Sequence, residues 1–139
     1  VVVDAPEGAE AALRESAAAA GVPDTRLQVR GALAGADRAA VIAGAAALLA
    51  PSTRTDYPWR ILDALALGVP VVAADSDVHR EVLLDGGVLV APDAEGLADG
   101  LTRALSVDPA RLSVLAADRG RAFSWDSAAE QVWHLHAEL

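Results

Sequence analysis

The sequence has 139 residues, which is enough for one domain with a buried core. It contains no cysteine, which excludes a disulfide framework, a thiol nucleophile and a thiolate zinc site. Its formal net charge of −9 argues against nucleic-acid binding, because basic side chains that neutralise phosphates supply most of that affinity.

The sequence carries no evident targeting or membrane-spanning segment. No apolar run approaches the ~18 residues that a membrane-spanning helix needs, and no basic residue precedes the first apolar run. We therefore expect a cytoplasmic protein without a transmembrane segment. All 11 basic residues are arginine, which together with abundant alanine and glycine suggests a GC-rich bacterial genome. Because methionine is absent, we expect the sequence to be part of a longer chain.

Five short apolar runs alternate with helical segments and predict one α/β domain over residues 1–139. Such near-continuous apolar strands are typical of a parallel sheet covered on both faces, which is a Rossmann-like three-layer α/β/α fold. Ligands of such folds bind beyond the carboxyl ends of the strands. The five predicted strands are residues 1–3, 26–30, 47–50, 69–74 and 88–90.

The predicted helices carry recognisable start and stop signals. A helix over residues 6–20 should end at Gly21, and a helix over residues 58–67 should end at Gly68, since glycine accommodates a helix C-terminus. Asp93 and Asp108 are predicted to cap the two helices that follow the last strand, the second of which Pro109 opens. A final helix starts near Ser124. The side chains expected to pack inward from these helices are Leu97, Leu101, Leu105, Trp125, Ala128, Val132, Trp133, Leu135 and Leu139.

The titratable side chains do not predict a metal site. The three histidines, His79, His134 and His136, are scattered along the chain, and we expect all three at the surface. The run Asp75-Ser76-Asp77 is more typical of a helix cap than of a metal site.

The stretch 51–92 resembles the group 1 glycosyltransferases. It reads PSTRTDYPWRILDALALGVPVVAADSDVHREVLLDGGVLVAP. In that family a strand ends in Pro-Ser, a signature helix follows, and then come a Gly-x-Pro-Val-Val-Ala strand, a Pro-Glu pair and a last apolar strand. Glu81 falls on the glutamate of the Pro-Glu pair. The other matching segments are residues 27–31, 62–66, 68–73, 87–90 and 123–125.

The resemblance implies one half of a GT-B fold. This half would be the C-terminal domain that binds a nucleotide-sugar donor, and the N-terminal acceptor domain is absent from the sequence. The family transfers a sugar from a nucleotide diphosphate to an acceptor with retention of configuration, and no metal or other cofactor is expected. A glycosyltransferase activity is thus implied for the complete enzyme, with this fragment inactive alone.

The resemblance also implies donor-binding residues. Asp63 stands at the carboxylate that holds the ribose hydroxyls, and Thr55 stands at the glutamate that binds the sugar. Two further candidates in the same loop are Asp56 and Tyr57, and Glu81 is a candidate acid on the next helix. Arg54, Arg60 and Arg80 are candidates for binding the diphosphate, since guanidinium groups bind phosphate in a bidentate manner. Each of these residues, as well as Trp59, has an alternative interpretation as an ordinary surface or packing residue.

Several positions depart from the family pattern. Pro58 has no N–H for a phosphate, and Asp56 adds negative charge where phosphates would lie. The family's upstream strand and helix, which carry an arginine and a lysine for the diphosphate, are not in the sequence. We therefore keep two alternatives: a degenerate, non-catalytic domain that binds a partner, and a different small α/β binding domain. A segment absent from the sequence or another copy of the chain could take the place of the upstream strand, but we expect the five strands to close up in the flavodoxin-like order 2-1-3-4-5.

Overall fold

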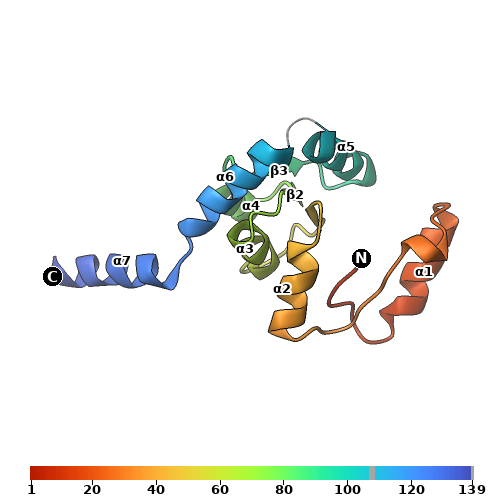
Figure 1. Ribbon diagram of the computed structural model, residues 1–139, viewed down its shortest axis with the longest axis horizontal. Helices are drawn as coiled ribbons and strands as arrows, with labels where there is room; N and C mark the ends of the chain where they lie inside the picture. The colour runs from red at the N-terminus through yellow and green to blue at the C-terminus, as the bar shows by residue number, and fades with distance from the viewer. Residues whose placement is uncertain (107–108, 139) are drawn as a thin grey trace. The chain divides into compact units, whose positions relative to one another are not determined.

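The structure is a computed structural model that describes residues 1–106 and 109–138 (Figure 1). The chain divides into two compact units, Val1–Val41 and Ile42–Leu139. The predicted cap Asp108 and the predicted packing residue Leu139 lie outside the described residues.

The first unit is mostly helical. It contains α1 (Ala9–Ala19), a short 3-10 helix η1 (Asp24–Arg26) and most of α2 (Gly35–Ala43), whose last two residues belong to the second unit. The helix α1 ends as predicted, because Gly21 takes a positive φ of 75° and donates its N–H to the carbonyl of Ala18 at 2.9 Å.

The predicted strands 1–3 and 26–30 shorten to a single parallel bridge. Val2 pairs with Val29, and the N–H of Val2 donates to the carbonyl of Gln28 at 2.7 Å. Two local conformations explain the shortening. Asp4 has a φ of 55°, which ends the extended backbone after Val3, and Arg26 belongs to the 3-10 helix rather than to a strand.

The second unit is a parallel α/β unit. Its strands are β1 (Leu48–Ala50), β2 (Val71–Ala74) and β3 (Gly87–Val90), in the order β1-β2-β3. The register pairs Ala50 with Ala73 and Ala74 with Val90. Its helices are α3 (Trp59–Ala66), α4 (Asp77–Leu83), α5 (Ala94–Ser106), α6 (Pro109–Arg121) and α7 (Trp125–Ala137).

Both faces of this sheet are covered, which confirms the predicted three layers for the second unit. All four residues of β2 are fully buried. Val71 and Ala73 belong to one core cluster with buried residues of α3, α4 and α6. Val72 points to the opposite face and joins Val90 and the buried Ala104 of α5. The alternation along β2 therefore places α3, α4 and α6 on one face and α5 on the other.

The expected sheet of five strands in the order 2-1-3-4-5 is not confirmed. The third, fourth and fifth predicted strands form a parallel sheet in sequence order, while the first two pair as an isolated bridge in the other unit. A pair of short segments has too few backbone hydrogen bonds and too little buried surface to extend into a regular sheet by itself.

The predicted inward packing of side chains is wrong for part of α5 and for α7. Leu97 and Leu101 of α5 pack against the sheet as predicted, but Leu105 is exposed. The helix α7 has no buried residue, and the indole side chains of Trp125 and Trp133 are 85% and 72% exposed. The spacing of apolar residues defines an apolar face of α7, but it does not supply a surface for that face to pack on.

Candidate functional site

The carboxyl ends of the three parallel strands lie at one edge of the sheet. Residues 51–58 follow β1, residues 75–76 follow β2, and residues 91–93 follow β3. The loop after β2 is bonded to the end of β3, since the N–H of Asp75 donates to the carbonyl of Val90 at 2.8 Å. This is the edge where ligands of parallel α/β folds bind, and we call residues 51–58 and 75–81 the carboxyl-edge segments.

The loop after β1 is held by local hydrogen bonds. The Ser52 hydroxyl donates to the carbonyl of Arg54 at 3.0 Å and accepts from its N–H at 3.2 Å. The Thr55 hydroxyl donates to the carbonyl of Tyr57 at 3.2 Å. These bonds give the loop a defined path, and Thr55 is half-buried while Arg54 and Asp56 are exposed.

Aromatic rings mark the junction between this loop and α3. The ring centroids of Tyr57 and Trp59 are 4.4 Å apart with planes inclined by 51°. Both rings are about half exposed, so they present an aromatic surface to solvent rather than packing into the core. Between them, Pro58 is buried at the start of α3.

Asp63 lies on the partly exposed side of α3. The opposite side of the helix buries Ile61, Ala64 and Leu65 in the core, which leaves Asp63 half-buried and Arg60 exposed. Asp63 is four residues after Trp59, so the two side chains share one face of the helix. The carboxylate predicted to hold a ribose therefore lies on the face that also carries an exposed aromatic ring.

Arg80 is engaged by two carboxylates. Its guanidinium contacts Asp75 at 2.6 Å and Asp77 at 2.8 Å. The hydrogen bond to Asp75 is the main cause that raises the pKa of Arg80 above its ordinary value. The Ser76 hydroxyl accepts from the N–H of His79 at 3.2 Å, which confirms the predicted helix cap of α4. Arg80 thus pairs with neighbouring acids. This arrangement agrees with the alternative interpretation of Arg80 as an ordinary surface residue.

Glu81 has an exposed side chain on α4, and its backbone is held from another helix. Arg119 of α6 donates from Nη2 to the Glu81 carbonyl at 2.7 Å and from Nε to the Val82 carbonyl at 2.8 Å. No local sequence pattern indicates this contact, because 38 residues separate Arg119 from Glu81.

His79 corrects the expectation that all three histidines lie at the surface. Only 2% of it is exposed, and its Nδ1 lies 2.7 Å from the carbonyl oxygen of Ala74. The position of His79 on α4, three and four residues before the buried Val82 and Leu83, is the signal that could have placed it inside. His134 and His136 are exposed, as predicted.

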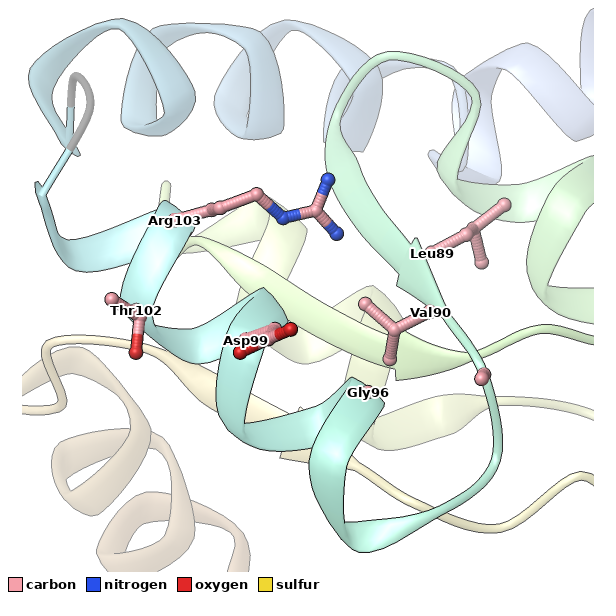
Figure 2. Close-up of a pocket in the computed structure, with 7 residues that line it drawn as sticks. Leu89, Val90, Gly96, Asp99, Thr102 and Arg103 are labelled. Atoms are coloured by element: carbon pink, nitrogen blue, oxygen red, sulfur yellow. The ribbon is translucent and has the colours of Figure 1, made fainter.

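A hollow of about 620 Å³ lies beside β3 and α5 (Figure 2). None of the predicted site residues lines it. It is open to solvent, and its charged side chains, Asp99 and Arg103, are both exposed. The residues that line it are Leu89, Val90, Ala91, Gly96, Asp99, Thr102 and Arg103.

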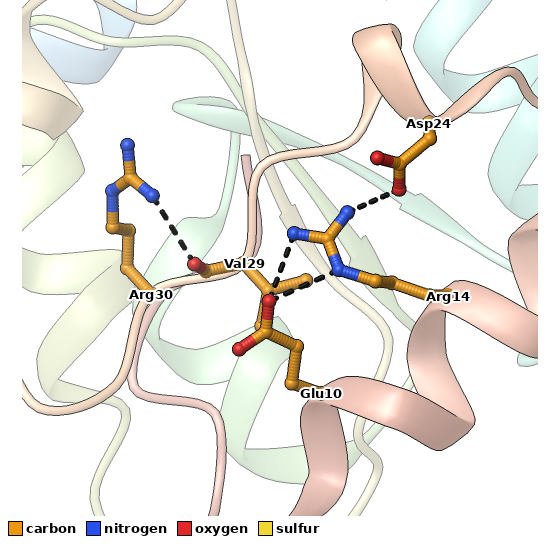
Figure 3. A network of polar contacts seen from close by, with 5 residues as sticks. All are labelled: Glu10, Arg14, Asp24, Val29 and Arg30. Atoms are coloured by element: carbon orange, nitrogen blue, oxygen red, sulfur yellow. Dashed lines mark hydrogen bonds and ion pairs between the residues drawn. The ribbon is translucent and has the colours of Figure 1, made fainter.

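The polar network of the first unit is a surface network. Arg14 of α1 bonds to Glu10 at 2.8 Å and also pairs with Asp24 (Figure 3). The hydrogen bonds that Arg14 donates, first to Glu10 and then to Asp24, raise the pKa of Arg14. Because the partners are solvent-exposed, such pairs stabilise a fold weakly, and they tie α1 to η1 without forming a ligand site.

Within residues 1–106 and 109–138, no group of three or more histidine or acidic side chains could hold a metal ion. The helices of this part of the chain include none that is both long and apolar enough to cross a membrane.

A parallel sheet with helices on both faces and polar loops at its carboxyl edge defines a Rossmann-like α/β unit. Residues 1–107 match the family profile of Glycosyl transferases group 1. The chain therefore belongs to the group 1 glycosyltransferases.

The curated relatives are bacterial glycosyltransferases that are much longer than this chain. The chain is 34% identical over 111 residues to phosphatidyl-myo-inositol mannosyltransferase of Mycobacterium tuberculosis, a match that covers 73% of the chain and 29% of the relative. It is 36% identical over 93 residues to D-inositol 3-phosphate glycosyltransferase of Corynebacterium aurimucosum, covering 63% of the chain and 22% of the relative.

Solved structures of the same fold cover nearly the whole chain. Sucrose-phosphate synthase from Thermosynechococcus elongatus superposes with a TM-score of 0.81 at 26% identity, over 98% of this chain and 37% of that chain. HepE from Anabaena, in complex with UDP, superposes with a TM-score of 0.77 at 22% identity, over 99% of this chain and 40% of that chain. At 22% identity the second likeness concerns the fold alone.

Proposed function

We propose that the chain is the nucleotide-sugar-binding domain of a retaining glycosyltransferase. In this proposal the donor lies at the carboxyl-edge segments and the adjoining helix α3, with Asp63 on the ribose hydroxyls, Glu81 and Thr55 near the sugar, and Arg60 near the diphosphate. The observation that carries the proposal is that α3 and α4 are the helices that follow two adjacent parallel strands, β1 and β2, in a chain of this family.

The chemistry of these side chains supports a donor of this kind. A carboxylate can accept two hydrogen bonds from a ribose diol, and the exposed rings of Tyr57 and Trp59 offer an apolar surface to a base or sugar. Solved structures of HepE, which shares the fold, hold UDP and UDP-glucose.

The complete protein would carry a second domain that binds the acceptor. The chain spans 22–29% of the length of the curated relatives that it matches, and this difference leaves room for such a domain. In that case the chain alone provides one wall of the active site and does not transfer sugar. A cytoplasmic location stays a prediction.

The second candidate function is a non-catalytic domain that binds a partner. Two observations favour it. Thr55 replaces a carboxylate of the family pattern, and Arg80 is held by Asp75 and Asp77 rather than left open to a diphosphate.

The decisive test uses the full-length protein with a panel of uridine, guanosine and thymidine diphosphate sugars. Release of the nucleoside diphosphate in the presence of a bacterial lipid or sugar acceptor would support the first function. Nuclear magnetic resonance of the product should then show the anomeric configuration of the donor. If none of these donors is bound or consumed, the result favours the non-catalytic function.

A further inference from the structure

The C-terminal end of α4 is held by a single arginine of α6. The last carbonyls of a helix have no partner within the helix, and α4 has only seven residues. Arg119 donates to two of these carbonyls, those of Glu81 and Val82, at 2.7 and 2.8 Å. A guanidinium group supplies both donors in a fixed planar geometry, which a lysine side chain cannot reproduce.

Further contacts fix the Arg119 side chain itself. Its guanidinium carbon lies 4.7 Å from the ring centroid of Phe123, at a distance where the ring face attracts a cation. Its stem lies close to Gly86, because a Cβ added at Gly86 would be 2.9 Å from the Cβ of Arg119. The side chain therefore has little freedom to leave α4.

The next residue of α6 contacts α3. A Cβ added at Gly120 would lie 2.7 Å from the carbonyl carbon of Leu65 and 2.8 Å from its oxygen. The backbone of α6 at Gly120 is thus packed directly against the backbone of α3 at Leu65. Two consecutive residues, Arg119 and Gly120, contact the two helices that carry Glu81 and Asp63.

We propose that Arg119 is a positioning residue for donor binding, which holds α4, and Glu81 with it, in register with α3 and Asp63. The inference rests on the proposed function of those two carboxylates. Arg119 itself does not touch the donor in this proposal. It acts through the backbone of Glu81, and small displacements of a binding group cost much of its effect.

The test is a double-mutant cycle in the full-length protein, with the donor dissociation constant and the kcat and KM of transfer as readouts. The variants are Arg119→Ala, Glu81→Gln and the double variant, and the matched control is Arg121→Ala. Arg121 lies two residues further along α6, is exposed, and pairs with the exposed Asp118 at 2.8 Å. Thermal unfolding of each variant identifies any that fail to fold.

We expect Arg119→Ala and Glu81→Gln each to weaken donor binding about tenfold. The double variant should be little worse than either single variant, because both changes impair the same contact between the Glu81 side chain and the donor. Arg119→Lys should recover only part of the affinity, and guanidinium ion at low concentration should restore affinity to Arg119→Ala. Arg121→Ala should bind the donor like the wild type.

The outcomes separate this inference from the proposed function. If the wild type binds a donor and Glu81→Gln weakens it, but Arg119→Ala does not, the inference alone is overturned. Losses that multiply in the double variant also overturn it, since they would show that Arg119 stabilises the fold without acting through Glu81. If the wild-type protein binds no nucleotide sugar, both the proposed function and the inference fail.

Discussion

Nδ1 of His79 lies 2.7 Å from the carbonyl oxygen of Ala74, so the first turn of α4 is bonded to the last residue of β2. A carbonyl only accepts, and therefore Nδ1 carries the proton in this pair. Because the ring is buried, the bond is shielded from water and fixes the start of α4 relative to the carboxyl edge of the sheet.

Replacement of His79 by leucine should destabilise the protein by about 1–3 kcal/mol, because the buried carbonyl of Ala74 loses its donor. Urea unfolding followed by circular dichroism measures this change. His134→Leu is the control, since His134 is exposed on α7 and its replacement should change the free energy of unfolding by less than about 0.5 kcal/mol. Equal effects of the two substitutions would contradict the role of the His79 bond.

Asp63→Asn should reduce sugar transfer by the full-length protein about tenfold or more, since a hydrogen bond to a charged group contributes roughly 1.5–3 kcal/mol. Folding should be nearly unchanged, because Asp63 is on the partly exposed side of α3. The measurement is kcat/KM for the donor. Asp99→Asn in the hollow beside β3 is the matched control, and a larger loss there would place the donor in the hollow instead.

The 139-residue chain alone should bind uridine, guanosine or thymidine diphosphates with a Kd of roughly 1 mM, about −4 kcal/mol. We expect a low affinity because Arg80 is already paired with Asp75 and Asp77. Titration calorimetry measures it. Micromolar binding would show that the arginines of this chain are sufficient for the diphosphate.

Gly68→Ala should destabilise the second unit by about 1 kcal/mol or more, because Gly68 ends α3 with a φ of 68°, a conformation that strains residues with a Cβ. The helix end depends on it, since the next residue, Val69, donates to the carbonyl of Ala64 at 2.8 Å. Gly35→Ala is the control, as a Cβ there meets open space and φ is not positive. Thermal unfolding should show a lower Tm for Gly68→Ala only.

Trp125→Ala and Trp133→Ala should each change the free energy of unfolding of this chain by less than about 0.5 kcal/mol, since both indoles are mostly exposed. Ile61→Ala, by contrast, should cost about 2–5 kcal/mol, because Ile61 is buried in the main core cluster. Urea unfolding separates the two cases. A large loss for either tryptophan would support the packing role that the sequence pattern predicted.

The sequence by itself determined the family, the parallel order of the last three strands and the ends of most helices. These features depend on local signals. Apolar runs such as residues 69–74 are long enough to form buried strands, and Gly21, Gly68 and Ser76 set helix ends through their own backbone or side-chain chemistry. The candidate Asp63 also followed from the sequence alone, because its motif is contiguous.

The tertiary structure decided which side chains meet across the chain. Arg119 contacts the backbone of α4 although 38 residues separate it from Glu81. No local pattern encodes such distances. The predicted burial of α7 is wrong for the same reason. Its apolar face has no surface to pack against in the described part of the chain, and none of its residues is buried. Burial depends on which surfaces come together in three dimensions, whereas periodicity gives only the face that each helix offers.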